Sequence, residues 1–316
     1  MRTSLLFYIA VQALAAHGFH RIRVYNPPGD EVFTPNAAML SFSLQQLVSI
    51  GYLPALPVET VRSVQEDPES LYVMTSMHHL SNVPLHFVIY NLEQLCIQRV
   101  DIEYEINNVT RFMDLALDVW DYSANNVACL EERYGRTGVR LIPVGYSPVL
   151  ELKSPVRRPI DVLFLGGVNA VRSETLYNVA RLAASKDRIY RACSACWQDE
   201  RFSGRIGINL PYFRGGNRTL EVNRIIPWVT NRVYTISMAA PDPYYMALME
   251  GLVDIAQDED EFMRLVDAAL SLDPAELSAR AEERYAKLKE RLNFTDLLFE
   301  SGAGRALLDI LEGRVT

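Results

Sequence analysis

The residues best suited to chemistry follow an apolar run at positions 162–165. Gly166 and Gly167 end this run. Asn169 and Arg172 come next, in a polar turn before a helical pattern. Glycines let the backbone approach a phosphate, and a helix N-terminus offers free N–H groups and a positive dipole end. Arg172 could add a bidentate contact. The stretch predicts an anion site, although glycine turns of this kind also occur in α/β proteins without one.

A second group of polar residues follows the apolar run at positions 206–210. Asn209 and Tyr212 lie where that run ends, and ligands of open α/β sheets bind at the carboxyl ends of strands. The alternative is a turn asparagine and a packing tyrosine. Glu221 and Arg224 are three residues apart on a predicted helix and share one face. They could form a ligand site or a solvated ion pair of little energetic weight.

Strand and helix patterns alternate along the chain, which predicts parallel sheets covered by helices on both faces. Apolar runs predict strands at residues 21–25, 53–58, 71–75, 85–90, 140–144, 162–165, 189–192, 206–210 and 233–237. Helical periodicity predicts helices at residues 37–51, 109–118, 125–134, 174–185, 219–230, 259–272, 274–291 and 306–311. The proline-rich stretch at residues 148–160 interrupts the alternation and reads as an interdomain linker.

The length and charge of the chain limit the possible functions. At 316 residues it is long enough for two domains with separate cores. A net charge of −8 argues against general nucleic-acid binding, which needs a basic face. One local basic cleft is predicted between residues 201 and 232. Its members are Arg201, Arg205, Arg214, Arg218, Arg224 and Arg232.

The four cysteines predict no disulfide framework, and small buried thiols fit a reducing, cytoplasmic location. Cys193 and Cys196 form a C-x-x-C pair without the further ligands of a zinc site. Arg2 precedes a short apolar run that resembles a signal peptide. We favour instead a packed helix over residues 4–17, and we expect no transmembrane segment.

Several stretches resemble GT-B glycosyltransferases of a bacterial and viral group, over about residues 85–295. They are VIYNLEQL, VWDYSANN and LIPVGYSP in the first half, and GRIGINLPYF, LEVNRIIPWVTNRVYTIS and EGLVDIAQDEDEFMRLV in the second. The resemblance implies an α/β, GT-B-like fold with two Rossmann-like domains facing across a cleft. The expected N-terminal acceptor domain is 1–150 and the nucleotide-sugar domain is 151–300. A helix within 301–316 is expected to pack back on the first domain.

The resemblance also implies a function, namely transfer of a sugar from a nucleotide-diphosphate sugar, with UDP or GDP as the nucleotide. Glu221 would bind a sugar or ribose hydroxyl, and Arg224 would neutralise phosphate. A second acid is expected downstream of Glu221, where Pro227 and Trp228 stand instead. The residues implied in donor binding are Gly166, Gly167, Asn169, Arg172, Asn209, Tyr212, Glu221 and Arg224.

We expect no cofactor and no metal ion, because arginine and helix N-termini can stabilise the departing diphosphate. A base near the acceptor would come from the first half. The candidates are Glu93, with Asn91 and Gln94 beside it for acceptor hydroxyls, and Asp30, which could instead be a turn aspartate. His78 and His79 form no metal site by themselves.

Two other functions remain open at this stage. One is an epimerase that acts on the same donor, and the other is a non-catalytic or regulatory binding protein that kept the fold. The acceptor could be a glycan, a lipid, a protein or a modified base. The sequence leaves the stereochemical outcome and the oligomeric state undetermined.

Overall fold

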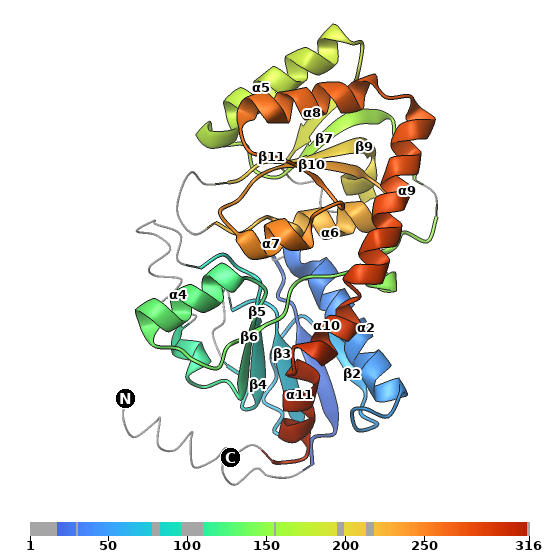
Figure 1. Ribbon diagram of the computed structural model, residues 1–316. Coiled ribbons are helices and arrows are strands. Elements are labelled where there is room, and N and C mark those ends of the chain that lie inside the picture. Colours follow the sequence, from blue (N-terminus) through green and yellow to red (C-terminus); the bar gives the residue numbers. More distant parts are fainter. Residues whose placement is uncertain are drawn as a thin grey trace. The chain divides into compact units, whose positions relative to one another are not determined.

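The computed structural model describes residues 18–29, 31–77, 83–95, 110–154, 156–194, 199–212 and 218–314. The chain forms two compact units (Figure 1). The first unit joins Met1–Pro143 to Phe294–Thr316, and the second unit is Val144–Asn293. The last residues of the chain therefore belong to the same unit as the first.

The first unit contains a parallel sheet of strand order β2-β1-β3-β4-β5-β6 among its described residues. The strands are β1 (Arg21–Tyr25), β2 (Val58–Val61), β3 (Ser70–Met74), β4 (Phe87–Asn91), β5 (Asp118–Asp121) and β6 (Arg140–Leu141). The strand predicted at residues 53–58 is wrong, because Tyr52 and Leu53 both donate their amides to the carbonyl of Leu47 and so stay with the preceding helix.

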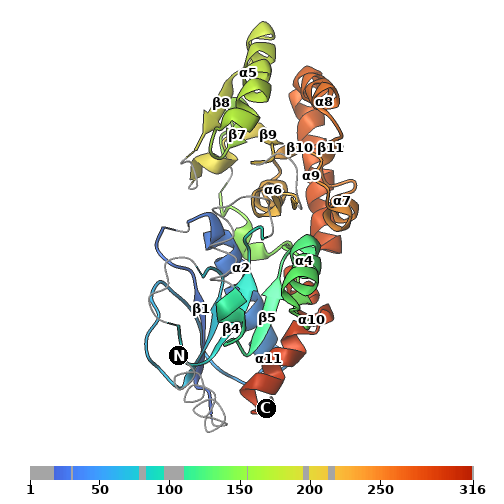
Figure 2. The same ribbon diagram turned by 90° about the vertical axis from the view of Figure 1, so that its left-hand side faces the viewer.

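Helices from both ends of the chain pack on this sheet (Figures 1 and 2). Phe294 stacks on Tyr90 with ring centroids 6.1 Å apart, and Thr295 donates to the hydroxyl of Ser43 at 3.0 Å. The described helices are α2 (Thr34–Ser49), α4 (Ala124–Tyr134), α10 (Phe294–Glu300) and α11 (Ala303–Leu311), with a 3₁₀ turn at Glu31–Phe33. The predicted helix at 109–118 is too long, since β5 begins at Asp118.

The second unit contains a parallel sheet of strand order β11-β10-β9-β7-β8. Its strands are β7 (Ile160–Leu165), β8 (Tyr190–Cys193), β9 (Gly204–Asn209), β10 (Tyr234–Met238) and β11 (Asp254–Ala256). Its helices are α5 (Ala170–Ser185), α6 (Val222–Thr230), α7 (Pro243–Leu248), α8 (Glu259–Ser271) and α9 (Pro274–Arg291), with 3₁₀ turns at Pro148–Leu150 and Asp199–Phe202.

The two faces of this second sheet are packed differently. On one face, alternate strand residues such as Phe164 and Ile208 lie in a core with α5 and α8. On the other face, Trp228 of α6 lies directly over Gly207 of β9. A Cβ atom at Gly207 would be 2.7 Å from the indole ring, so this approach requires glycine. The close contact holds α6 against the sheet.

The cysteines differ from the prediction of free thiols. Cys129 and Cys193 are each disulfide-bonded, and no cysteine among the described residues is free. The number of cysteines does not show which cysteine side chains lie close together in the fold. The free thiols from which a cytoplasmic location was inferred are therefore not present among the described residues. Cys196 and residues 1–17 lie outside the described residues. Among the described helices, none combines the length and the apolar character that a membrane span requires.

Candidate functional site

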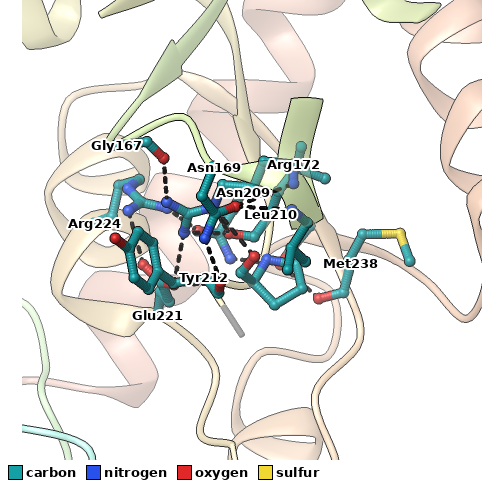
Figure 3. A network of polar contacts seen from close by, with 12 residues as sticks. Gly167, Asn169, Arg172, Asn209, Leu210, Tyr212, Glu221, Arg224 and Met238 are labelled. Carbon is teal, nitrogen blue, oxygen red and sulfur yellow. Dashed lines mark hydrogen bonds and ion pairs between the residues drawn. The ribbon is translucent and has the colours of Figure 1, made fainter. Parts of the chain in front are cut away.

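The residues predicted to bind a donor come together at the carboxyl ends of β7 and β9 and the N-termini of α5 and α6 (Figure 3). In parallel sheets this edge is where ligands bind. Hydrogen bonds, ion pairs or close side-chain approaches connect all members of this group, which we call the glycine-loop site. They are Gly166, Gly167, Asn169, Arg172, Asn209, Tyr212, Glu221 and Arg224.

Gly166 has a backbone conformation and surroundings that exclude other residues. Its φ angle is +138°, which L side chains rarely adopt. A Cβ atom there would lie 2.9 Å from Nη2 of Arg224 and 3.4 Å from Nη1 of Arg172. The glycine therefore lets both guanidinium groups approach the backbone of the loop. Figure 3 shows Arg172 and Arg224 converging beside Gly167.

Asn169 joins the start of α5 to the loop after β9. Its Oδ1 accepts from the amides of Val171 and Arg172 at 3.1 and 3.2 Å, so the residue caps the helix. Its Nδ2 donates to the carbonyl of Tyr212 at 2.7 Å. Both ends of the side chain are thus bonded within the protein, and the role that this geometry assigns to Asn169 is to position the helix N-terminus.

Arg172 is buried, with 1% of its side chain exposed, and most of its donors are already engaged. Nε and Nη2 donate to the carbonyl of Leu210 at 3.1 and 2.7 Å, and Nη1 donates to the carbonyl of Gly167 at 2.8 Å. Nη2 also bonds Oε1 of Glu221 at 2.9 Å. Burial lowers the pKa of Arg172 to about 10. This arginine organises the site, and its geometry does not match an open phosphate clamp.

Glu221 bridges the two arginines from the N-cap position of α6. Its Oε2 lies 2.7 Å from Nη2 of Arg224, whose Nη1 donates to Oδ1 of Asn209 at 2.6 Å. The amide of Tyr212 donates to Oε1 of Glu221 at 3.2 Å. The exposed side-chain fractions are 7% for Arg224 and 19% for Glu221, so the alternative of a solvated surface ion pair is wrong.

Some donors in the glycine-loop site have no acceptor among the described residues. Nε of Arg224 is buried and has no acceptor among the described residues. Within the same described part of the chain, the amides of Gly167 and Val168 also have no acceptor. These groups lie beside the N-terminus of α5, which carries a positive partial charge. The arrangement suits an anion that approaches the loop backbone.

The arginines between residues 201 and 232 do not form the single basic cleft that was predicted. Arg224 lies at the carboxyl edge of the second sheet, and the charge of Glu221 acts on Arg218 nearby. Arg205 and Arg232 line a separate cavity at the amino ends of β9 and β10. Neighbours in sequence are separated here because β9 and α6 each carry the chain from one sheet edge to the other. Arg214 lies outside the described residues.

One acidic triplet has the D-x-D spacing by which many sugar transferases bind a metal ion. It spans Asp258 to Asp260. Asp258 caps α8, since its Oδ1 accepts from the amide of Glu261 at 2.8 Å. Among the described residues, no group of three or more His, Cys, Asp or Glu side chains could hold a metal ion.

Glu93, one of the predicted bases, lies just beyond the carboxyl end of β4 in the first unit. Its side chain is half-buried, and its backbone is held by two asparagines. Asn91 and Asn126 donate to the Glu93 carbonyl at 3.0 and 2.7 Å. Asn91 is itself buried and engaged, so its amide is not the open acceptor ligand that was expected. Asp30, His78 and His79 lie outside the described residues.

Sequence analysis did not identify Asp121, which anchors the loop that carries Glu93. Asp121 is fully buried at the end of β5. Its carboxylate accepts from the Ser123 amide at 2.8 Å and from Nδ2 of Asn91 at 2.7 Å. It also accepts from Nδ2 of Asn126 at 3.0 Å. Burial raises the pKa of Asp121 to about 7, against the effect of these donors. The pattern D-x-S-x-x-N is the signal that could have revealed it.

Comparisons with known proteins identify the fold. No family model matches the sequence, and no curated protein is similar to it in sequence. Solved structures do match: a variant of TarM from S. aureus, in complex with fondaparinux, alpha-GlcNAc-glycerol and UDP, has a TM-score of 0.54 at 5% identity over 78% of this chain. Sucrose-phosphate synthase from Thermosynechococcus elongatus has a TM-score of 0.54 at 12% identity over 92%.

A third match is an alpha,alpha-trehalose-phosphate synthase (UDP-forming) from Burkholderia vietnamiensis, with a TM-score of 0.53 at 11% identity over 94% of this chain. All three have the GT-B fold. This chain has the GT-B fold. It spans 56% of the TarM variant, 99% of the sucrose-phosphate synthase and 98% of the trehalose-phosphate synthase. The predicted fold class is confirmed, with two parallel sheets and flanking helices.

Replacing Arg172 by Gln should destabilise the chain by roughly 3–5 kcal/mol, because Glu221 loses one of its two buried cations and three loop carbonyls lose their donor. Urea unfolding of the full chain measures the loss. Arg181→Gln removes the same charge from an exposed position on the same helix, and its effect should stay within about 0.5 kcal/mol. Equal stability of the two variants would show that Arg172 is not the organising residue.

Asp121 should make stability depend on pH. Its folded pKa of about 7 lies above the ordinary aspartate value of 3.8, so the unfolded chain releases this proton first as pH rises. The stabilisation is present below about pH 4 and is lost as pH rises to about 7. The difference in unfolding free energy between the parent and Asp121→Asn, measured from pH 4.5 to pH 8, should fall over that window. A difference that stays flat would contradict the raised pKa.

Proposed function

We propose that this protein is a glycosyltransferase that moves a sugar from a nucleotide-diphosphate sugar to an acceptor, without a metal ion. The observation that carries the proposal is the convergence of the glycine loop, the α5 N-terminus and Arg224 at the carboxyl edge of the second sheet. The GT-B fold supports it. So do two of the matching structures, since one is a complex with UDP and the other is a UDP-forming synthase.

We propose different roles for the residues of the glycine-loop site. We assign the diphosphate to the donors that lack an acceptor among the described residues, which are Nε of Arg224 and the amides of Gly167 and Val168. Arg172 is bonded to loop carbonyls and to Glu221, so its role is to hold the loop. As the sugar–phosphate bond breaks, negative charge grows on the leaving diphosphate. Fixed donors of this kind stabilise that charge without reorganisation.

Glu221 has a more limited role than the resemblance implies. Its two oxygens already accept from Arg172, Arg224 and the Tyr212 amide. A carboxylate offers about four lone-pair positions, which leaves room for one ligand hydroxyl. We therefore propose that Glu221 orients Arg224 and accepts at most one hydroxyl of the donor.

The residues that we propose for the acceptor side of the reaction belong to the first unit. We propose Glu93 as the base, since it follows the carboxyl end of β4 and Asp121 fixes its backbone through Asn91 and Asn126. Asp30 remains the second candidate. The acceptor, whether glycan, lipid, protein or modified base, is not specified by these contacts.

A nucleoside diphosphate should raise the melting temperature of the parent, because it binds only the native state. A panel of UDP, GDP and ADP identifies the nucleotide. Arg224→Gln should weaken that binding about ten- to hundredfold, since a charge-assisted hydrogen bond is lost. Arg264→Gln, the same charge change at an exposed position of α8, is the matched control. The donor site is wrong if Arg224→Gln binds the whole panel as the parent does.

Turnover separates an enzyme from a binding protein of the same fold. Donor hydrolysis or transfer by the parent, undiminished by EDTA, is expected. Glu93→Gln should reduce turnover while leaving nucleotide affinity unchanged. Binding without any turnover over a panel of nucleotide sugars would favour the non-catalytic alternative, and inhibition by EDTA would contradict metal independence.

A further inference from the structure

A second cluster of arginines lies at the opposite edge of the second sheet from the glycine-loop site. Arg158 lies two residues before β7, Arg205 is the second residue of β9, and Arg232 lies two residues before β10. These three strands are neighbours in the order β10-β9-β7, so their amino ends bring the three side chains to one place. The first turns of α9 form the facing wall, through Leu277 and Ser278 among others.

The three arginines line one cavity of about 290 Å³. Among the described residues that line it, the charged ones are all arginines, and none is an Asp or Glu. A smaller cavity of about 20 Å³ shares Arg205 and Leu277 with it. A hollow lined by three guanidinium groups, one hydroxyl and an apolar helix face is suited to a small anion with an organic part.

The charges around this cavity are incompletely balanced. Asp161 is shared, because Arg205 bonds it at 3.3 Å and Arg188 lies 3.9 Å from it. Arg232 has two acidic partners, Glu282 at 3.1 Å and Glu151 at 3.7 Å. Among the described residues Arg158 has no carboxylate partner. The charge of Arg158 is thus not balanced by a direct ion pair with a described residue.

Arg158 carries this unbalanced positive charge. Two of its nitrogens donate to the carbonyls of Asn231 and Arg232, while its buried Nε has no acceptor in the described part of the chain. Burial and the nearby charge of Arg232 lower the pKa of Arg158. An anion in the cavity would offset this repulsion. Arg205, with 41% of its side chain exposed, is accessible from solvent.

We propose that this cavity is a binding site for the phosphate group of a small phosphorylated molecule, separate from the glycine-loop site. A phosphate presents several oxygens to the arginine forks, and the apolar wall of α9 can contact the organic part. The site lies at the amino ends of the strands, so a ligand here would regulate or stabilise the second unit and would not react.

Calorimetric titration at constant ionic strength tests this, with inorganic phosphate and glycerol phosphate as probes. The protein is the full chain carrying Arg224→Gln, which weakens phosphate binding at the glycine-loop site. We expect this protein to bind the probes. Adding Arg205→Gln should weaken binding about tenfold or more, while adding Arg264→Gln should leave it unchanged. Arg205 is half-exposed, so its replacement should preserve folding, which the melting temperature checks.

The outcomes are distinguishable. Tighter binding of glycerol phosphate identifies a phosphorylated metabolite as the ligand class, and tighter binding of inorganic phosphate identifies free phosphate. The proposal is overturned if neither probe binds the Arg224→Gln protein, or if Arg205→Gln and the double variant Arg158→Gln, Arg205→Gln bind both probes as their parent does. Because the titration does not measure sugar transfer, its failure would leave the proposed enzyme function standing.

Discussion

The carboxylate of Glu221 is the group on which the candidate donor site depends. It lies 2.9 Å from Arg172 and 2.7 Å from Arg224, and without it two buried guanidinium groups would face each other unbalanced. Each arginine then holds a different part of the edge. Arg172 gathers the carbonyls of Gly167 and Leu210, and Arg224 bonds Asn209 at the end of β9. The bridge thereby joins two strands and two helices at the candidate donor site.

Packing away from the carboxyl edge of the second sheet positions the carboxylate of Glu221. The indole of Trp228 occupies the space above Gly207, so α6 lies close to the sheet and its N-cap residue, Glu221, reaches the glycine loop. In the first unit a different carboxylate positions a loop. There Asp121, buried at the end of β5, fixes two asparagines and through them the backbone of Glu93. In both units a carboxylate holds the loop at the carboxyl edge.

The parallel sheets and most helices were predictable, because buried strands and amphipathic helices leave clear periodicities. The exception at residues 53–58 is an apolar stretch tied to the end of α2, which periodicity alone cannot distinguish from a strand. The members of the glycine-loop site were also predictable, since each follows a strand or begins a helix. Their roles were not: the burial of Arg172 and its bonds to carbonyls arise from residues about forty positions away. The disulfide of Cys129 likewise left no sequence signal.

A crystal structure of the chain with the best-binding nucleoside diphosphate is the decisive experiment for the candidate donor site. We expect the diphosphate within hydrogen-bond distance of Nε of Arg224 and of the Gly167 and Val168 amides, and we expect Glu221 still to bridge Arg172 and Arg224. A diphosphate bound elsewhere on the chain, or a Glu221 carboxylate displaced from both arginines, would show that this site does not bind the donor in the proposed way.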